Sequence, residues 1–281
     1  MKRRLIALVV AALAFARPAA AQQRPLATED PEPIGAGRIL IEGGFDYAKD
    51  AQYPAAGLQG DLLRLPTIGV SIGISSIAEL QIDGGLYNRL AITDRSNAPL
   101  SSLLTIDGDS THDVEDLVVA TKIRVLAESA RHPALALRFA TRLPNAGNES
   151  GLGLDTTDFY VTALGAKTVQ SVRIVANLGL GILSDPTFID RQNDVLMYGV
   201  SFARAITDRA EFVGEVNGRW STRSGGPFPG TETRSLLNLG GRYTVRSLRL
   251  DGQLFFGLTT SDPTVGFGAG FTYVFSAFQV P

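Results

Sequence analysis

The sequence contains no cysteine, only two histidines (His112 and His132) and a single tryptophan in 281 residues. The lack of cysteine excludes a disulfide framework, a thiolate metal site and a cysteine nucleophile. Two histidines this far apart argue against a histidine-based zinc site. Lysine and arginine (26) do not exceed aspartate and glutamate (28), so the basic excess typical of nucleic-acid-binding proteins is missing. We therefore expect no metal, no cofactor and no nucleic-acid partner.

Long apolar runs are also scarce, and the one that exists lies at the N-terminus. Residues 5–16 are uninterrupted apolar residues that follow Lys2, Arg3 and Arg4, and the residues at 19–21 are three alanines. This order matches a secretory signal with an A-x-A cleavage site. The run is shorter than the roughly 20 residues that a helix needs to span a bilayer. We predict a cleaved signal peptide over residues 1–21 and export to a bacterial envelope.

From Arg38 onward the chain alternates between apolar and polar or small residues, which is the period of β-strands with two different faces. In the last such segment, apolar residues fill the odd positions from 265 to 275, whereas Gly266, Gly268 and Gly270 share the other face. Segments of this kind number about twelve, and each is near the length of about 9–11 residues expected for a tilted membrane strand. They cover residues 38–48, 62–74, 78–88, 114–125, 134–142, 158–167, 173–183, 194–204, 211–220, 234–243, 248–258 and 265–275.

The connections between these segments also alternate. Long ones (49–61, 89–113, 143–157, 184–193, 221–233 and 259–264) follow odd segments, and shorter ones (75–77, 126–133, 168–172, 205–210 and 244–247) follow even segments. An even strand number with long loops at one end favours a transmembrane, antiparallel, up-and-down β-barrel over a soluble sandwich or an eight-stranded soluble barrel. The predicted organisation is a signal peptide (1–21), a proline-rich lead in the periplasm or the lumen (22–37), the barrel (38–276) and a short tail (277–281).

Three local features of the barrel can be predicted. Pro66 cannot donate to a strand ladder, so we expect a bulge there that places Arg64 on the same face as Thr67. Tyrosines and a tryptophan near the segment ends suggest aromatic girdles, with Tyr160 and Trp220 at the loop end and Tyr243 at the turn end. The bare inner wall at Gly266, Gly268 and Gly270 either widens the lumen or leaves room for a loop or the lead.

The start of the mature chain carries a family resemblance. Residues 24–31 read RPLATEDP, and residues 35–42 continue with GAGR into a first strand that carries Glu42. Residues 72–80 (IGISSIAEL) and 206–212 (ITDRAEF) are strand–turn–strand motifs with a short polar turn. Together they resemble exported proteins grouped under the MetA pathway of phenol degradation. The resemblance implies an outer-membrane barrel that acts as a channel or transporter.

The face opposite the apolar one carries charges that we predict to line the pore. They are Glu42, Asp46, Arg64, Glu79, Asp83, Lys122, Arg124, Arg138, Arg142, Arg173, Glu211, Glu215, Arg219, Arg242, Arg249 and Asp251. Acids on the first and third segments and bases on the fourth, fifth and seventh would produce a transverse field that filters solutes by charge. Alternatively, the same groups pair across the lumen and close it, because charges in a narrow lumen need partners.

These patterns favour a channel for passive uptake of small solutes, hydrophobic or aromatic ones among them, through a charged lumen. The alternative is a non-conducting structural or adhesion barrel whose external loops bind a ligand. We expect no catalytic residues: His112 is predicted in the long loop 89–113 and His132 in a turn, neither beside a strand serine. Expected partners are outer-membrane lipid, a small-molecule solute and, during biogenesis, the barrel-assembly machinery. A monomer is expected, since no strand shows an extra apolar patch.

Overall fold

The computed structural model describes residues 24–188 and 190–279, so the predicted signal peptide (1–21) lies outside the described residues. The chain forms one antiparallel sheet of fourteen strands. They are β1 (Arg38–Tyr53), β2 (Leu58–Gly73), β3 (Ala78–Gly85), β4 (Asn88–Arg95), β5 (Ser110–Asp113), β6 (Val118–Leu126), β7 (Ala134–Arg142), β8 (Asp158–Val169), β9 (Val172–Ser184), β10 (Gln192–Ala205), β11 (Ala210–Ser221), β12 (Arg234–Val245), β13 (Leu248–Gly257) and β14 (Val265–Ser276). Two short 3₁₀ turns, η1 (Ser101–Leu103) and η2 (Asn148–Ser150), lie in connections. No helix in the described part of the chain is long and apolar enough to cross a membrane.

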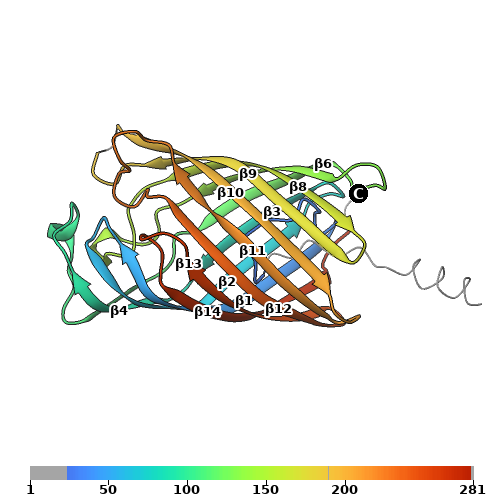
Figure 1. Cartoon of the computed structure of the whole chain (residues 1–281), viewed down its shortest axis with the longest axis horizontal. Helices are drawn as coiled ribbons and strands as arrows, with labels where there is room; N and C mark the ends of the chain where they lie inside the picture. Colours follow the sequence, from blue (N-terminus) through green and yellow to red (C-terminus); the bar gives the residue numbers. More distant parts are fainter. Residues whose placement is uncertain (1–23, 189, 280–281) are drawn as a thin grey trace, which may run out of the picture.

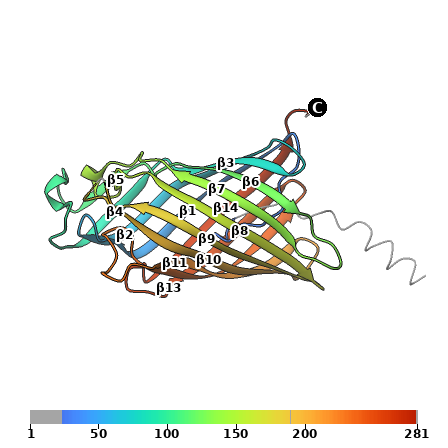
Figure 2. The same cartoon turned by 90° about the horizontal axis from the view of Figure 1, so that it is seen from above.

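The sheet closes into a barrel with twelve positions in its wall, as predicted. From β6 to β14, each strand pairs with the next one in the chain. Strand β1 pairs with β14 on one side and with β2 on the other. Both β3 and β4 pair with β2 and are separated only by residues 86–87, so together they form one wall strand with a break. In the same way, β5 and β6 are separated only by residues 114–117 and form one wall strand, in which β5 pairs with β4 and β6 pairs with β3. Figures 1 and 2 show the tilted strands from two sides.

The connections separate into two ends of the barrel. At the loop side they are residues 54–57, 96–109, 143–157, 185–191, 222–233 and 258–264, and at the turn side they are 74–77, 127–133, 170–171, 206–209 and 246–247. In both views the long connections lie at one end and the C-terminus lies at the other (Figures 1 and 2). This asymmetry is the layout expected of an outer-membrane barrel.

The two faces of the wall have opposite character. Large apolar side chains point outward and are exposed, with Leu178 at 58% and Leu254 at 53%. Polar and charged side chains point inward and are buried, with Lys122 and Thr272 at 0% and Glu79 at 1%. A soluble protein has the reverse arrangement. The alternation along each strand therefore places an apolar surface around a polar interior.

The predicted bulge at Pro66 is present. Gly44 of β1 pairs with Thr67 of β2, but two residues further along β1, Asp46 pairs with Arg64. Three residues of β2 thus oppose two of β1, and the extra residue changes the parity of the strand. Arg64 and Thr67 consequently face inward, while Leu65 is 47% exposed on the outside.

Several predicted boundaries were wrong. The first hairpin turns at residues 54–57, not over 49–61, because a second register shift between Ala48 and Ala51 keeps β1 and β2 paired beyond the turn-like residues. The predicted loop 89–113 contributes β4 and β5, which shortens the true loop to 96–109. His112 therefore lies in strand β5, where its ring lies 5.6 Å from that of Tyr87.

The end of the last strand and the aromatic girdles can also be compared with the predictions. The last strand ends at Ser276, one residue beyond the prediction. Trp220 and Tyr243 are exposed on the outer face, with 59% and 46% of their surface accessible. Tyr160 does not belong to this girdle, because its hydroxyl lies 3.2 Å from the buried Asp158 carboxylate on the inner face.

Candidate functional site

Residues 24–34 of the predicted lead (22–37) lie inside the barrel. From here on, the lead means the segment from Arg24 to Ile34. Its hydrogen-bond and ion-pair partners belong to β1, β2, β3, β6, β9, β11, β12 and β13. These strands occupy all sides of the closed wall. A single segment can contact all of them only from within the lumen, so the lead crosses the lumen.

The first residue of the lead is held by four strands. The Arg24 backbone N–H donates to Glu42, its guanidinium donates to the Thr67 hydroxyl at 3.0 Å and lies 3.4 Å from the Asp251 carboxylate, and its carbonyl accepts from Arg242. Two glycines of the wall make room for this side chain. A Cβ at Gly44 or Gly270 would come within 2.5 Å of the Arg24 guanidinium. The bare stretch of wall noted in the sequence therefore accommodates part of the lead.

The centre of the lead is fixed through its backbone. Both carboxylate oxygens of Glu215 accept hydrogen bonds of 2.8 Å, one from the N–H of Ala27 and one from that of Thr28. Asn177 accepts from the Glu29 N–H at 2.7 Å and returns a bond of 2.8 Å to the Glu29 carbonyl. Wall side chains thus replace the neighbouring strand that an extended backbone would otherwise require.

A buried cation joins the lead to the wall. The Lys122 ammonium has no exposed surface and lies 2.6 Å from the Glu29 carboxylate, 3.0 Å from that of Glu79 and 2.9 Å from the Asp30 carbonyl. These three acceptors satisfy its three N–H donors. Two further pairs, Arg173 with Asp30 and Arg124 with Glu32, follow along the lead.

Most of the predicted pore-lining residues contact either the lead or an opposite charge. Those that contact the lead are Glu42, Glu79, Lys122, Arg124, Arg138, Arg173, Glu215, Arg242 and Asp251. Those paired with another wall residue are Asp46, Arg64, Asp83, Arg142, Glu211 and Arg249. Arg219 differs, since its guanidinium donates to the backbone carbonyls of Gly230 and Glu232. Whether these residues line a conducting path stays a prediction.

Several residues of the site were missed by the sequence reasoning. The charges of the lead (Arg24, Glu29, Asp30 and Glu32) gave no signal of their position, because strand alternation does not reveal what fills the interior. Arg234 could have been found, because it has the parity of Arg242 on the same strand and pairs in register with Arg219.

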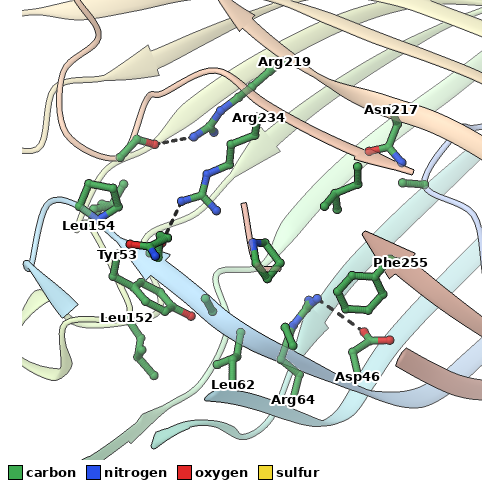
Figure 3. Close-up of a pocket in the computed structure, with 18 of the residues that line it drawn as sticks. Asp46, Tyr53, Leu62, Arg64, Leu152, Leu154, Asn217, Arg219, Arg234 and Phe255 are labelled. Carbon is green, nitrogen blue, oxygen red and sulfur yellow. Dashed lines mark hydrogen bonds and ion pairs between the residues drawn. The ribbon is translucent and has the colours of Figure 1, made fainter. Parts of the chain in front are cut away.

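Above the lead, toward the loop side, the lumen is hollow. Three cavities of about 440, 370 and 480 Å³ lie there, and Ala27 and Arg219 line all three. We call the first of these the loop-side chamber. Its lining includes Tyr53, Leu152 and Pro263 from the loop-side connections and strand ends, and Pro25 and Ala27 from the lead. Figure 3 shows Arg219 and Arg234 side by side in this chamber, with Arg64 on the wall across from them. The lead forms the floor of the chamber.

Among residues 24–188 and 190–279, no group of three or more histidine, aspartate or glutamate side chains could hold a metal ion. His132 lies in the turn 127–133, and its ring nitrogen is 3.4 Å from the Pro133 carbonyl.

Comparisons with solved structures identify the type of fold. A COG4313 outer membrane channel from Pseudomonas putida F1 superposes with a TM-score of 0.62 at 14% identity, over 88% of this chain and 98% of that one. The fold is that of outer-membrane β-barrels. The translocator domain of the autotransporter NalP from Neisseria meningitidis (TM-score 0.51, 14% identity, 85% of this chain and 88% of that one) and the NanC porin (0.50, 7%, 84% and 98%) are also similar.

Comparisons of sequence are negative. No family model matches the chain, and no curated protein matches it. The resemblance to the MetA-pathway proteins therefore stays a prediction, while the barrel that it implied is present.

Proposed function

We propose that the protein is a channel of the Gram-negative outer membrane. Small solutes, hydrophobic or aromatic ones among them, would diffuse through its charged lumen and pass the lead. The barrel fold and its apolar outer face support a position in the membrane. Such a channel needs no catalytic residues, and we propose none.

One observation carries the proposal. The three cavities share Ala27 and Arg219, so they lie next to one another around the lead and the loop-side part of the lumen. A barrel whose interior served only for stability would be filled by side chains. Here the loop-side part is hollow, and the lead occupies the lumen below it, so we take the lead as the constriction of the proposed channel. The lead therefore sets the conductance of the proposed channel.

Single-channel recording of the refolded mature protein (residues 22–281) in a planar bilayer tests this. We expect small discrete conductance steps. The double variant Glu29→Gln/Asp30→Asn removes the ion pairs of the lead with Lys122 and Arg173. It also removes the pair of Glu29 with Arg138, but Lys122, Arg138 and Arg173 each keep one wall-side acid, namely Glu79, Asp83 and Glu128. We expect this variant to conduct severalfold more.

A matched control removes two acids elsewhere. Asp107→Asn/Asp109→Asn changes the same amount of charge in the exposed loop 96–109 and should leave the conductance unchanged. The heat-modifiable mobility of the barrel on gels reports that each variant has folded. Silence of both the wild type and the lead variant in folded protein would contradict the proposal and would favour the non-conducting barrel with ligand-binding loops.

A further inference from the structure

Two arginines in the loop-side chamber stand directly opposite each other. Arg219 of β11 and Arg234 of β12 are a register pair, and both line the chamber (Figure 3). Like charges directly opposite on neighbouring strands destabilise a sheet. Elsewhere in the same lumen, facing cations are separated by acids, as where Glu211 lies 3.9 Å from both Arg242 and Arg249.

Neither arginine forms an ion pair with an acid in the part of the chain that the structure describes. Arg219 donates to the carbonyls of Glu232 and Gly230 at 2.8 and 2.7 Å, and Arg234 donates to the Gln52 carbonyl at 2.9 Å. The buried Nε of Arg234 has no partner among the described residues. The carboxylate of Glu232 accepts from the Gly230 N–H instead. No carboxylate in the described ranges lies within 4.0 Å of either guanidinium, whereas the other arginines of the chamber, Arg64 and Arg142, each have two acids.

Neighbouring guanidinium groups with free donors suit a carboxylate. A carboxylate has two oxygens that accept charge-assisted hydrogen bonds, and arginine recognises it in a planar geometry. An anion between Arg219 and Arg234 would remove the repulsion between the two guanidinium groups. A pair of like charges that repel each other in the empty protein, and that a bound anion would neutralise, is typical of a binding site.

Much of the remaining lining of the chamber is apolar, although Asp46, Arg64 and Arg142 also contribute to it. Tyr53, Leu62, Leu152, Leu154 and Phe255 form much of its lining. Its volume of about 440 Å³ lies within the range of roughly 300–1,000 Å³ found for small-molecule sites. A ligand that fits must therefore have a charged end for the arginines and an apolar body for this wall.

We propose that the loop-side chamber binds organic monocarboxylates with an apolar or aromatic body, with the carboxylate between Arg219 and Arg234. This inference rests on the proposed channel function and names the class of solute that enters it.

Calorimetric titration of the refolded mature barrel in a non-ionic detergent tests the site with three probes. They are 4-phenylbutyrate, the neutral 4-phenylbutanol and the short butyrate. We expect 4-phenylbutyrate to bind and each of the other two probes to bind about tenfold more weakly or worse. The reason is that 4-phenylbutanol lacks the carboxylate and butyrate lacks the aromatic ring. Equal affinity for 4-phenylbutyrate and 4-phenylbutanol, or for 4-phenylbutyrate and butyrate, would overturn the proposal, as would no binding of 4-phenylbutyrate.

Variants locate the binding. Arg219→Gln and Arg234→Gln should each weaken 4-phenylbutyrate by about tenfold, as expected for a lost charged hydrogen bond. Arg209→Gln, in the exposed turn 206–209 at the other end of the barrel, is the matched control and should bind like the wild type. If an arginine variant does not fold, Leu154→Asn in the loop-side connection tests the apolar half. Unchanged affinity in the variants that fold would overturn the proposal.

The titration does not depend on conduction, so the two proposals can fail separately. A barrel that binds 4-phenylbutyrate but stays silent in bilayers would keep the site and contradict the channel. A barrel that conducts but does not discriminate among the probes would keep the channel and contradict the site.

Discussion

The turn-side and loop-side parts of the lumen treat charge in opposite ways. In the turn-side part, the lead fills the space, and Lys122 is buried against Glu29 and Glu79. In the loop-side chamber, Arg219 and Arg234 line the cavity. Neither guanidinium has a carboxylate within 4.0 Å among the described residues, unlike Arg142. The same barrel wall thus builds one half in which the lead supplies partners for the wall charges and another half that holds two arginines without an ion-pair partner. The difference teaches that a charge in the lumen is costly where the protein supplies no partner, and that such a position is available to an external anion.

The largest effect should come from unbalancing the turn-side half. Lys122→Met leaves Glu29 and Glu79 buried without their cation, which should lower the free energy of unfolding by about 3–5 kcal/mol. Urea unfolding of the refolded barrel in lipid vesicles measures this. Lys49→Met, at an exposed position of β1, is the control and should change stability by less than about 0.5 kcal/mol. Equal urea midpoints for the two variants would show that the buried cluster contributes little.

Thiol labelling can locate the boundary between the two halves, because the protein has no native cysteine. Ala27 is exposed to all three cavities, whereas the neighbouring Leu26 is only 7% exposed. A water-soluble thiol reagent added from the loop side should modify Ala27→Cys several times faster than Leu26→Cys, since reaction requires access. Similar rates at both positions would mean that the lead leaves the position described here.

Ion selectivity should depend on the unpaired charges more than on the paired ones. Arg219→Gln/Arg234→Gln removes two uncompensated cations and should shift the reversal potential in a KCl gradient toward cation selectivity. Arg124→Gln/Glu32→Gln removes one complete ion pair and should leave the reversal potential almost unchanged. A larger shift in the second variant would contradict the contrast between the two halves.

The smallest effect concerns pH at the turn side. Burial opposes ionisation of Glu128, but hydrogen bonds from Thr168 and Arg173 outweigh it and lower the pKa of Glu128 below its ordinary value of 4.5. A lowered pKa in the folded state adds stability that is present above pH 4.5 and is lost as the pH falls through the folded-state value. Glu128→Gln should therefore reduce stability slightly at pH 7, and the difference from the wild type should shrink as the pH falls below 4.5. A difference that stays the same as the pH falls would point to packing instead of charge.

The barrel could be predicted because its signal is local. Alternation assigns each side chain to a face, and one proline at position 66 was enough to place Arg64 inside. The first hairpin was predicted too short because Asp50, Pro54 and Gly57 resemble loop residues, although a second bulge absorbs the irregularity and the pairing continues.

The contents of the lumen could not be predicted to the same degree. Wall charges such as Lys122 and Glu215 were assigned to the correct face, but their partners lie in a segment about 90 to 190 positions away in the chain. No periodicity connects such distant residues. The sequence therefore left two interpretations of the same charges, a field across the lumen or a network of ion pairs, and the lead that supplies many of the pairs was one of two possible placements.

The position of the lead also has a consequence for the order of folding. Arg24 is held at once by Glu42 near the start of the sheet and by Asp251 near its end. These two side chains come together only when β14 pairs with β1, so the lead cannot complete its contacts before the barrel has closed. The complete set of contacts of the first described residues therefore requires a chain closed over most of its length. The first described segment of the chain is in this sense among the last to complete its contacts, and its docked position reports that the wall is complete.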